Sequence, residues 1–356
     1  MRKQSKIYIA GHTGLVGSAI LKDLLEKGYN NLVFRTHFDL DLTNQDEVKT
    51  FFEQEKPEYV ILAAAKVGGI IANNTYRANF IYENLMIQNN IIHQSYVSGI
   101  KKLLFLGSTC IYPKNASQPM KEDALLCSEL EYTNEPYAIA KIAGIKMCES
   151  YNLQYGTNFI AVMPTNLYGP NDNFDLEKSH VLPALIRKIH LGKCIEDDNR
   201  EAIKIDLNRN PIEGVNGSSS EKEILEILSK YGIEKGQIEI WGSGEPRREF
   251  LWSEDMADAC VFLLENRDFD QTFSIEDKEV RNTHINIGTG VDISIMELAD
   301  QIKSCVGYQG VFNFDISKPE GTMKKLTDVS KLHQLGWKHK INLEEGVEKM
   351  YLWYLS

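Results

Sequence analysis

The chain has 356 residues, of which 43% are hydrophobic and 25% are charged, close to the average soluble globular protein, so disordered and collagen-like chains are excluded. A typical size of about 100–200 residues per domain predicts two or three domains. Acidic residues (50) outnumber basic ones (39) and give a net charge of −11, which argues against a surface for nucleic acid or anionic membranes. An anionic substrate would therefore need a local basic pocket.

Signals for targeting, disulfides and metals are absent from the sequence pattern. The apolar stretches are far shorter than the ~20 residues that cross a bilayer, and residues 1–5 lead into a strand pattern without a signal peptide's apolar region. Six scattered cysteines without a C-x-x-C pair are typical of reduced thiols. The histidines show no spacing such as H-E-x-x-H, so no metal site is expected. We expect a cytoplasmic protein that binds neither nucleic acid nor membrane.

The first half of the chain alternates between strand and helix patterns. Apolar runs predict strands over 7–10, 32–34, 59–65, 102–107 and 158–163, and helices are predicted over 15–26, 45–54, within 75–98 and over 138–154. Repeated βαβ units form a parallel sheet with helices on both faces, because each right-handed crossover lays its helix on a face. We therefore expect an α/β fold with a Rossmann-type doubly wound sheet, which binds ligands beyond the carboxyl ends of its strands.

The second half has shorter elements. Its patterns predict helices over 182–191, 254–265, 294–306 and 343–354 and a strand over 238–241. We expect a nucleotide-binding domain over 1–170, joined by part of 242–290. Residues 171–356 are expected to form mainly a smaller α/β substrate-binding domain.

A polar stretch at about 194–236 is predicted to be a surface insertion with its own helix. Ser220 and Glu223 have the spacing of a capping box, and an amphipathic pattern follows them. Gly232 then ends the helical pattern.

A glycine-rich turn follows the first predicted strand. Gly11, Gly14 and Gly17 form the spacing G-x-x-G-x-x-G between that strand and a helix. The first glycine makes the tight turn, the second lets the backbone approach a pyrophosphate, and the third permits close helix–strand packing. The helix N-terminus offers free N–H groups to phosphates. A lone glycine triplet could be an ordinary turn, but the βαβ context favours a dinucleotide site.

Asp41, after the second strand, has two interpretations. It is placed to meet the adenine end of a dinucleotide, or it caps the helix that begins near Thr43. The stretch from Thr43 to Asp46 resembles a variant capping box.

A serine, a tyrosine and a lysine indicate carbonyl reduction. Ser108 follows the strand over 102–107, and Tyr137 and Lys141 lie four residues apart at the start of a predicted helix. A neighbouring ammonium lowers the pKa of a phenol from ~10, so Tyr137 is expected to protonate a ketone oxygen while a nicotinamide supplies hydride. Lys141 can also hold the nicotinamide ribose, and Ser108 can bond the carbonyl. The Y-x-x-x-K pair alone occurs by chance in many helices, but together with the glycine turn and the serine it is specific.

These motifs extend into longer runs that resemble the extended short-chain dehydrogenase/reductase family. The runs lie at 62–70, 107–113, 134–141, 164–170, 241–244, 248–251 and 318–322. Within that family, the chain is most similar to enzymes that act on GDP-linked 4-keto-6-deoxyhexoses. The stretch at about 194–236 has no counterpart in the best-known members.

The resemblance implies an NADP(H)-dependent homodimer that epimerises C3 and C5 of a GDP-4-keto-6-deoxyhexose and then reduces its C4 ketone. A related alternative is a C4 reductase without epimerase activity that acts on a GDP-4-keto-heptose in polysaccharide precursor synthesis. A non-catalytic nucleotide-binding regulator on the same fold is disfavoured, because binding alone does not need the proton donor Tyr137 with Ser108 and Lys141.

The resemblance also assigns roles to individual residues. Ser108, Tyr137 and Lys141 form the reductase set, and Cys110 and His180 are the acid and base of epimerisation. Without the resemblance, Cys110 would be a buried small hydrophobe and His180 a cap or surface residue. The expected substrate contacts are Asn166, Lys188, Trp241, Arg248 and Glu320. The expected cofactor contacts are Gly11, His12, Thr13, Gly14, Leu15, Val16, Gly17, Arg35, His37, Asp41, Leu42, Ala63, Ala64, Leu106, Gly107, Ser108, Thr109, Tyr137, Lys141, Pro164, Thr165, Asn166, Leu167 and His180.

The chain departs from this family at the cofactor's 2′-phosphate. Thr13 and His37 stand where the best-known members have arginines, although Arg35 remains nearby. Because a bidentate guanidinium is lost at both places, we expect a weaker preference for NADPH over NADH than is usual. NADP(H) remains the expected cofactor, with NAD(H) as the alternative. Lys188 also replaces a familiar arginine.

Overall fold

The computed structural model describes residues 1–318 and 321–356, with the backbone alone at positions 70 and 71. The chain forms two compact units. Unit 1 comprises residues 1–171, 249–291 and 326–342, and unit 2 comprises residues 172–248, 292–325 and 343–356.

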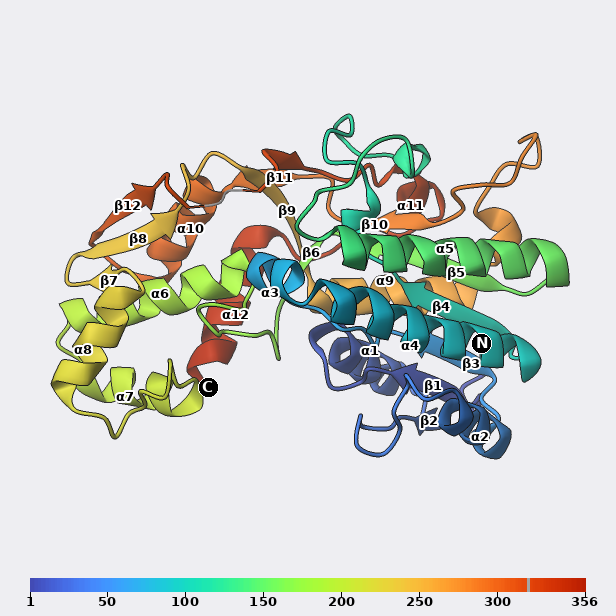
Figure 1. Cartoon of the computed structure of the whole chain (residues 1–356), viewed down its shortest axis with the longest axis horizontal. Coiled ribbons are helices and arrows are strands. Elements are labelled where there is room, and N and C mark those ends of the chain that lie inside the picture. Colours follow the sequence, from blue (N-terminus) through green and yellow to red (C-terminus); the bar gives the residue numbers. More distant parts are fainter. Residues whose placement is uncertain (319–320) are drawn as a thin grey trace. The chain divides into compact units, whose positions relative to one another are not determined.

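A six-stranded parallel sheet forms the centre of unit 1 (Figure 1). Its strands, in spatial order, are β10 (Ile285–Ile287), β5 (Phe159–Pro164), β4 (Lys102–Leu106), β3 (Tyr59–Leu62), β1 (Ile7–Ala10) and β2 (Leu32–Val33). The helices of this unit are α1 (Leu15–Glu26), α2 (Gln45–Glu55), α3 (Ile70–Thr75), α4 (Arg77–Val97), α5 (Glu135–Tyr155), α9 (Ser253–Asn266) and α11 (Ser330–Gln334). The predicted Rossmann-type α/β fold is confirmed.

Both faces of this sheet are buried, because successive side chains of a strand point to opposite faces. Ile7 and Ile9 pack in one core with residues of α1 and α9, whereas Tyr8 and Ala10 pack in a second core with residues of α2, α4 and α5. Figure 1 shows α4 and α5 side by side along one face. Because the strands are parallel, the carboxyl ends of β1, β3, β4 and β5 lie at the same edge of the sheet.

One helix start and one helix cap differ from the predicted ones, whereas the predicted start of α2 at Gln45 is confirmed. Helix α5 begins at Glu135 and not at residue 138, because Pro136 is tolerated in the first turn, where a missing N–H leaves no bond unmade. Helix α2 is capped by Asn44, whose side chain accepts from the backbone N–H groups of Asp46 and Glu47, and not by Thr43.

Unit 2 is built from a small sheet and helices. Strand β8 (Gln237–Trp241) pairs in parallel with β12 (Val311–Asp315) and antiparallel with β7 (Ile233–Glu234). The helices are α6 (Val181–Glu196), α7 (Arg200–Arg209), α8 (Glu221–Lys230), α10 (Ile295–Val306) and α12 (Leu343–Leu355). A further set of paired strands contains β6 (Asn166–Tyr168), which belongs to unit 1, and β11 (Asp292–Ser294) and β13 (Lys324–Lys325), which belong to unit 2. Its strand β9 (Arg247–Trp252) begins in unit 2 and continues in unit 1. In the described parts of the chain, no helix combines the length and apolar character needed to cross a bilayer.

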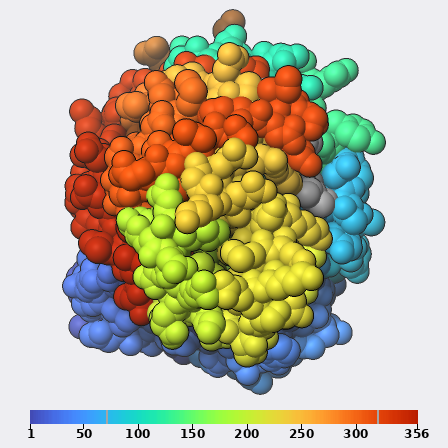
Figure 2. All heavy atoms as spheres, turned by 90° about the vertical axis from the view of Figure 1, so that its left-hand side faces the viewer, coloured from blue at the N-terminus to red at the C-terminus, as the bar shows by residue number. Residues whose placement is uncertain are grey.

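The polar stretch at about 194–236 folds around a core of its own. The predicted capping box is confirmed, since Ser220 and Glu223 exchange side-chain-to-backbone hydrogen bonds at the start of α8. Ile224 and Leu228 of this helix pack with Leu207 of α7 and Leu191 of α6. The stretch forms part of the surface visible in Figure 2, in yellow-green and yellow.

Candidate active site

The glycine turn is shaped by close backbone approach. Gly11 has a φ of 89°, and a Cβ there would lie 2.6 Å from the amide nitrogen of Ala64. A Cβ on Gly17 would collide with the carbonyl oxygen of Gly11. Gly14 is the N-cap of α1 and offers no capping side chain, so the first N–H groups of α1 stay available to an anion. A dinucleotide pyrophosphate fits this turn.

The residues beyond β2 are engaged with one another. The Arg35 guanidinium pairs with Glu55 at 2.5 Å and donates to the carbonyl oxygen of Phe34 at 2.8 Å. The ring of His12 packs on Phe34 with their centroids 4.5 Å apart. His37 is exposed.

Asp41 does not cap α2, because Asn44 is the N-cap of that helix; Asp41 instead closes the turn that precedes it. Its carboxylate accepts from the backbone N–H of Thr43 at 2.9 Å and from the Thr43 hydroxyl at 2.8 Å. These bonds lower the pKa of Asp41. The adenine-contact interpretation of Asp41 stays a prediction.

Ser108, Tyr137 and Lys141 come together at the carboxyl end of β4. The side chain of Ser108 hydrogen-bonds the Tyr137 hydroxyl and also accepts from the backbone N–H of Cys110 at 3.3 Å. The Lys141 ammonium donates to the carbonyl oxygen of Leu106 at 2.8 Å and lies 5.7 Å from the centroid of the Tyr137 ring. Strand β4 and helix α5 therefore present the three side chains as one cluster.

The pKa values of this cluster correct one prediction. Burial raises the pKa of Tyr137 above its usual value of 10, the negative charge of Cys110 adds to that rise, and the hydrogen bond with Ser108 opposes it. Burial also lowers the pKa of Lys141 to about 8. The predicted lowering of the Tyr137 pKa by Lys141 is wrong for this structure, because desolvation of the phenolate outweighs the nearby ammonium. Tyr137 is thus a neutral phenol that carries a proton to donate.

Cys110 belongs to this cluster, whereas His180 lies elsewhere in the chain. Cys110 sits in the 3-10 turn Thr109–Ile111, is buried, and interacts electrostatically with Tyr137 and Lys141. His180 is the N-cap of α6 in unit 2 and makes no side-chain cap. Desolvation lowers the pKa of His180, although its side chain retains exposed surface. The pairing of Cys110 with His180 stays a prediction.

The segment from Pro164 to Leu167 runs from the last residue of β5 into β6. The backbone N–H of Thr165 donates to the carbonyl oxygen of Ile287 at 3.0 Å. Asn166 donates through Nδ2 to the backbone carbonyl oxygen of Glu249 at 2.8 Å. This segment stands at the sheet edge next to β4, where a nicotinamide is expected.

Unit 2 gathers several of the predicted substrate contacts. Lys188 of α6 is buried, donates to the carbonyl oxygen of Glu239 at 3.0 Å, and has a pKa that burial lowers to about 8. Trp241 is half-exposed two residues further along β8, and the Lys318 ammonium lies 5.6 Å from the centroid of its ring. Lys318 was not among the predicted contacts, although it begins the run at 318–322. An indole face and two ammonium groups suit a nucleoside diphosphate.

Of the other two predicted substrate contacts, the structure describes only Arg248. Arg248 is partly buried, its pKa is lowered by burial, and its Nη1 donates to the carbonyl oxygen of Arg247 at 2.9 Å. Glu320 lies outside the described residues.

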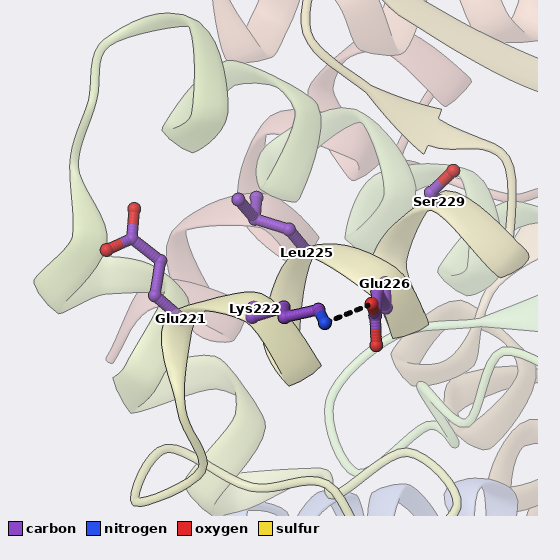
Figure 3. A pocket seen from close by; sticks show the side chains of 5 residues that line it. All are labelled: Glu221, Lys222, Leu225, Glu226 and Ser229. Atoms are coloured by element: carbon purple, nitrogen blue, oxygen red, sulfur yellow. Dashed lines mark ion pairs between the residues drawn. The ribbon is translucent and has the colours of Figure 1, made fainter.

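A hollow on the surface of the insertion is not the active site. Glu221, Lys222, Leu225, Glu226 and Ser229 line it, all from α8 (Figure 3). Lys222 and Glu226 form an ion pair across one helical turn at 3.7 Å. None of the predicted site residues lines this hollow.

No pattern in the sequence singles out Glu249. It lies in β9 within the run at 248–251, and its side chain is fully buried. A glutamate is expected at the surface unless it is paired or hydrogen-bonded, and its partners are distant in sequence. No local pattern could therefore have marked it.

The chain is similar to known proteins over almost its whole length. A family model described as the NAD dependent epimerase/dehydratase family matches residues 7–206 and 212–288. GDP-L-fucose synthase 1 of Arabidopsis thaliana is 51% identical over 354 residues, which cover 99% of this chain and 94% of the relative.

Two solved structures from Campylobacter jejuni are also similar. A GDP-6-OMe-4-keto-L-xylo-heptose reductase is 50% identical with a TM-score of 0.93, and the match covers 99% of this chain and 98% of that one. A GDP-D-glycero-L-gluco-heptose synthase, solved in the presence of NADPH, is 49% identical with a TM-score of 0.92 and full coverage of both chains.

Proposed function

Because the chain belongs to the NAD dependent epimerase/dehydratase family, we propose that it reduces the C4 ketone of a GDP-4-keto sugar with NADP(H). The observation that carries this proposal is the cluster of Ser108, neutral Tyr137 and buried Lys141 at the carboxyl end of β4. Proton donation to a developing alkoxide requires a protonated acid, which burial keeps in place on Tyr137.

The glycine turn and the uncapped N-terminus of α1 fit the pyrophosphate of the cofactor, which supplies the hydride when bound. In the proposed reaction Ser108 donates a hydrogen bond to the C4 oxygen and orients the ketone. Tyr137 delivers its proton to the same oxygen as negative charge develops. Lys141 stabilises that charge and holds the nicotinamide ribose. Phe80 packs edge-on against the Tyr137 ring at 6.4 Å and limits its movement.

For the substrate, we propose a GDP-4-keto-heptose. The support comes from the two heptose enzymes, which match this chain over nearly its whole length. Lys188 and Lys318 would neutralise the diphosphate, and Trp241 would stack on the base.

A second candidate adds C3 and C5 epimerisation of a 4-keto-6-deoxyhexose, as the resemblance to GDP-L-fucose synthases implies. The position of Cys110 beside Tyr137 and Lys141 favours it, since a thiol there can exchange a proton with the carbon next to the ketone.

One experiment separates the two candidates. NADPH oxidation is followed with a GDP-4-keto-heptose and with a GDP-4-keto-6-deoxyhexose in D₂O, and the products are analysed by NMR. We expect faster reduction of the heptose and no solvent deuterium at C3 or C5. Label at either carbon, lost in Cys110→Ser and His180→Asn, would favour the epimerase. Absence of NADPH oxidation with both sugars would reject the proposed reduction.

A further inference from the structure

The side chain of Glu249 joins three chain segments at the border of unit 1. Glu249 is the first residue of unit 1 after the chain leaves unit 2. Its bonding partners Thr289 and Gly290 lie just before Val291, where the chain leaves unit 1 again, and Thr327 lies just after the next return.

Every hydrogen bond to this buried carboxylate comes from a backbone N–H or a threonine hydroxyl. Oε1 accepts from the N–H groups of Thr289 at 2.6 Å and Gly290 at 2.7 Å. Oε2 accepts from the N–H of Thr327 at 2.9 Å and from its hydroxyl at 2.6 Å. Hydrogen bonds to a carboxylate are roughly twice as strong as bonds between neutral groups. The carboxylate therefore holds β9, the segment at 289–290 and Thr327 in fixed positions relative to one another.

The space for this carboxylate is made by a glycine. A Cβ on Gly288 would collide with Oε1 of Glu249 and with the hydroxyl of Thr327. Any side chain at position 288 would therefore displace the carboxylate from its partners. The buried position of the Glu249 side chain thus depends on the glycine at position 288.

The backbone of Glu249 links these three segments to residues beside the proposed reaction site. Its carbonyl oxygen accepts from Nδ2 of Asn166 at 2.8 Å and from the hydroxyl of Thr165 at 3.3 Å. These two residues follow β5 directly, with Asn166 opening β6, and β5 lies beside β4, the strand that precedes Ser108.

We propose that Glu249 is a positioning residue for the nicotinamide end of the cofactor. Its carboxylate fixes β9 against the segments at 288–290 and 327, and its carbonyl oxygen thereby sets Thr165 and Asn166 in place. The inference rests on the proposed function for the identity of the cofactor. It does not depend on which sugar is reduced.

The test compares Glu249→Gln with a matched buried glutamate. Glutamine keeps the size of the side chain, but it replaces one carboxylate oxygen with an NH₂ group. That group cannot accept the hydrogen bonds that the N–H and O–H donors make to this oxygen. Glu149 of α5 is also buried and also accepts from a threonine N–H and hydroxyl, at 3.3 and 3.4 Å from Thr283, and it additionally pairs with the Lys146 ammonium at 2.9 Å. Glu149→Gln is therefore the control for the loss of a buried carboxylate.

Dissociation constants are measured by calorimetry for NADPH and for 2′-phosphoadenosine diphosphoribose, which is NADP without its nicotinamide. In Glu249→Gln we expect NADPH to bind about tenfold more weakly and the truncated ligand to bind within about twofold of wild type. Glu149→Gln should change neither affinity. Thr327→Val removes one of the five hydrogen bonds to the carboxylate, the fifth being a 3.4 Å bond from the Thr289 hydroxyl to Oε1, and should show the same pattern with a smaller effect.

Equal weakening of both ligands, or of neither, in a Glu249→Gln protein that unfolds cooperatively would overturn the inference. If Glu249→Gln does not fold, Thr327→Val against Thr283→Val decides by the same comparison. Wild-type protein that binds NADPH but reduces no GDP-4-keto sugar would reject the proposed function and leave the Glu249 comparison valid. If wild type binds only NADH, the ligands become NADH and ADP-ribose. Binding of neither nucleotide would overturn both proposals.

Discussion

Tyr137 lies in the first turn of α5, where its ring packs against Phe80 and its hydroxyl bonds to Ser108. Burial disfavours its phenolate, and the same burial lowers the pKa of Lys141 to about 8. The first shift keeps the phenol protonated, and the second leaves Lys141 an ammonium that can lose its proton near pH 8. The pair therefore suits donation of a proton and not its abstraction.

Removal of the Tyr137 hydroxyl tests this role. Tyr137→Phe keeps the ring and its packing, so cofactor affinity should stay near wild type. Turnover should fall about 10²–10⁴-fold, the usual contribution of a general acid. Steady-state rates with NADPH and a GDP-4-keto sugar check the prediction, and near-normal turnover would remove Tyr137 from the mechanism.

The lowered pKa of Lys141 predicts a pH dependence of stability. Between pH 8 and its ordinary value of 10.5, the unfolded chain binds a proton on this lysine that the folded chain has released. The unfolding free energy contributed by Lys141 therefore rises with pH across that window. Denaturant titrations of wild type and Lys141→Met should show wild type gaining stability relative to the variant from pH 7 to 10. A constant difference would contradict the shift.

At the scale of elements, the sequence predicted what depends on local pattern. Strands β1, β3, β4 and β5 and helix α1 have strong apolar periodicity, and the structure places them within a few residues of the predicted bounds. Strand β10 has only three residues, too few to show a period. Strand β9 begins with charged residues that its long-range partners bury or pair.

The site divides in the same way. Ser108, Tyr137 and Lys141 could be predicted, because each stands at a marked position of a predicted element. The contacts of Glu249 join residues up to 84 positions apart, and the effect of burial on Tyr137 depends on its packing in the folded chain. Neither has a signal in local spacing.

Helix α8 offers a test of the insertion as a folded element. Ser220 caps it reciprocally with Glu223, and apolar residues of the helix join a core with α6 and α7. Ser220→Ala should lower the free energy of unfolding by ~1 kcal/mol. Ser218→Ala, in the preceding exposed turn, is the control and should change it by less than ~0.5 kcal/mol. Equal effects would show that the cap does not stabilise the helix.

At the scale of the whole molecule, the net charge of −11 would repel the negatively charged diphosphate of the proposed substrate and the phosphates of the cofactor. Local cations offset this repulsion, since Lys188 and Lys318 gather near Trp241 in unit 2. A homodimer remains an expectation from the resemblance, and light scattering of the purified protein measures it.

The preference for NADPH over NADH depends on whether cationic side chains of unit 1 are available to bind the 2′-phosphate. Arg35 is paired with Glu55, and Thr13 and His37 replace two arginines, so the 2′-phosphate has few unengaged cations to meet. We expect kcat/KM for NADPH to exceed that for NADH by less than about 100-fold, the range of one or two charged hydrogen bonds. Glu55→Gln should raise the ratio by freeing Arg35. A ratio far above 100-fold would show that other groups hold the phosphate.

The most direct measurement of the central claim is the fate of the hydride. A GDP-4-keto-heptose is reduced with NADPH that carries deuterium on the transferred position of C4 of the nicotinamide, and the product is analysed by NMR. Reduction by the Ser108, Tyr137 and Lys141 cluster predicts one deuterium at C4 of the sugar and none elsewhere on the ring. Recovery of the ketone unchanged, or of a product without deuterium at C4, would contradict the account.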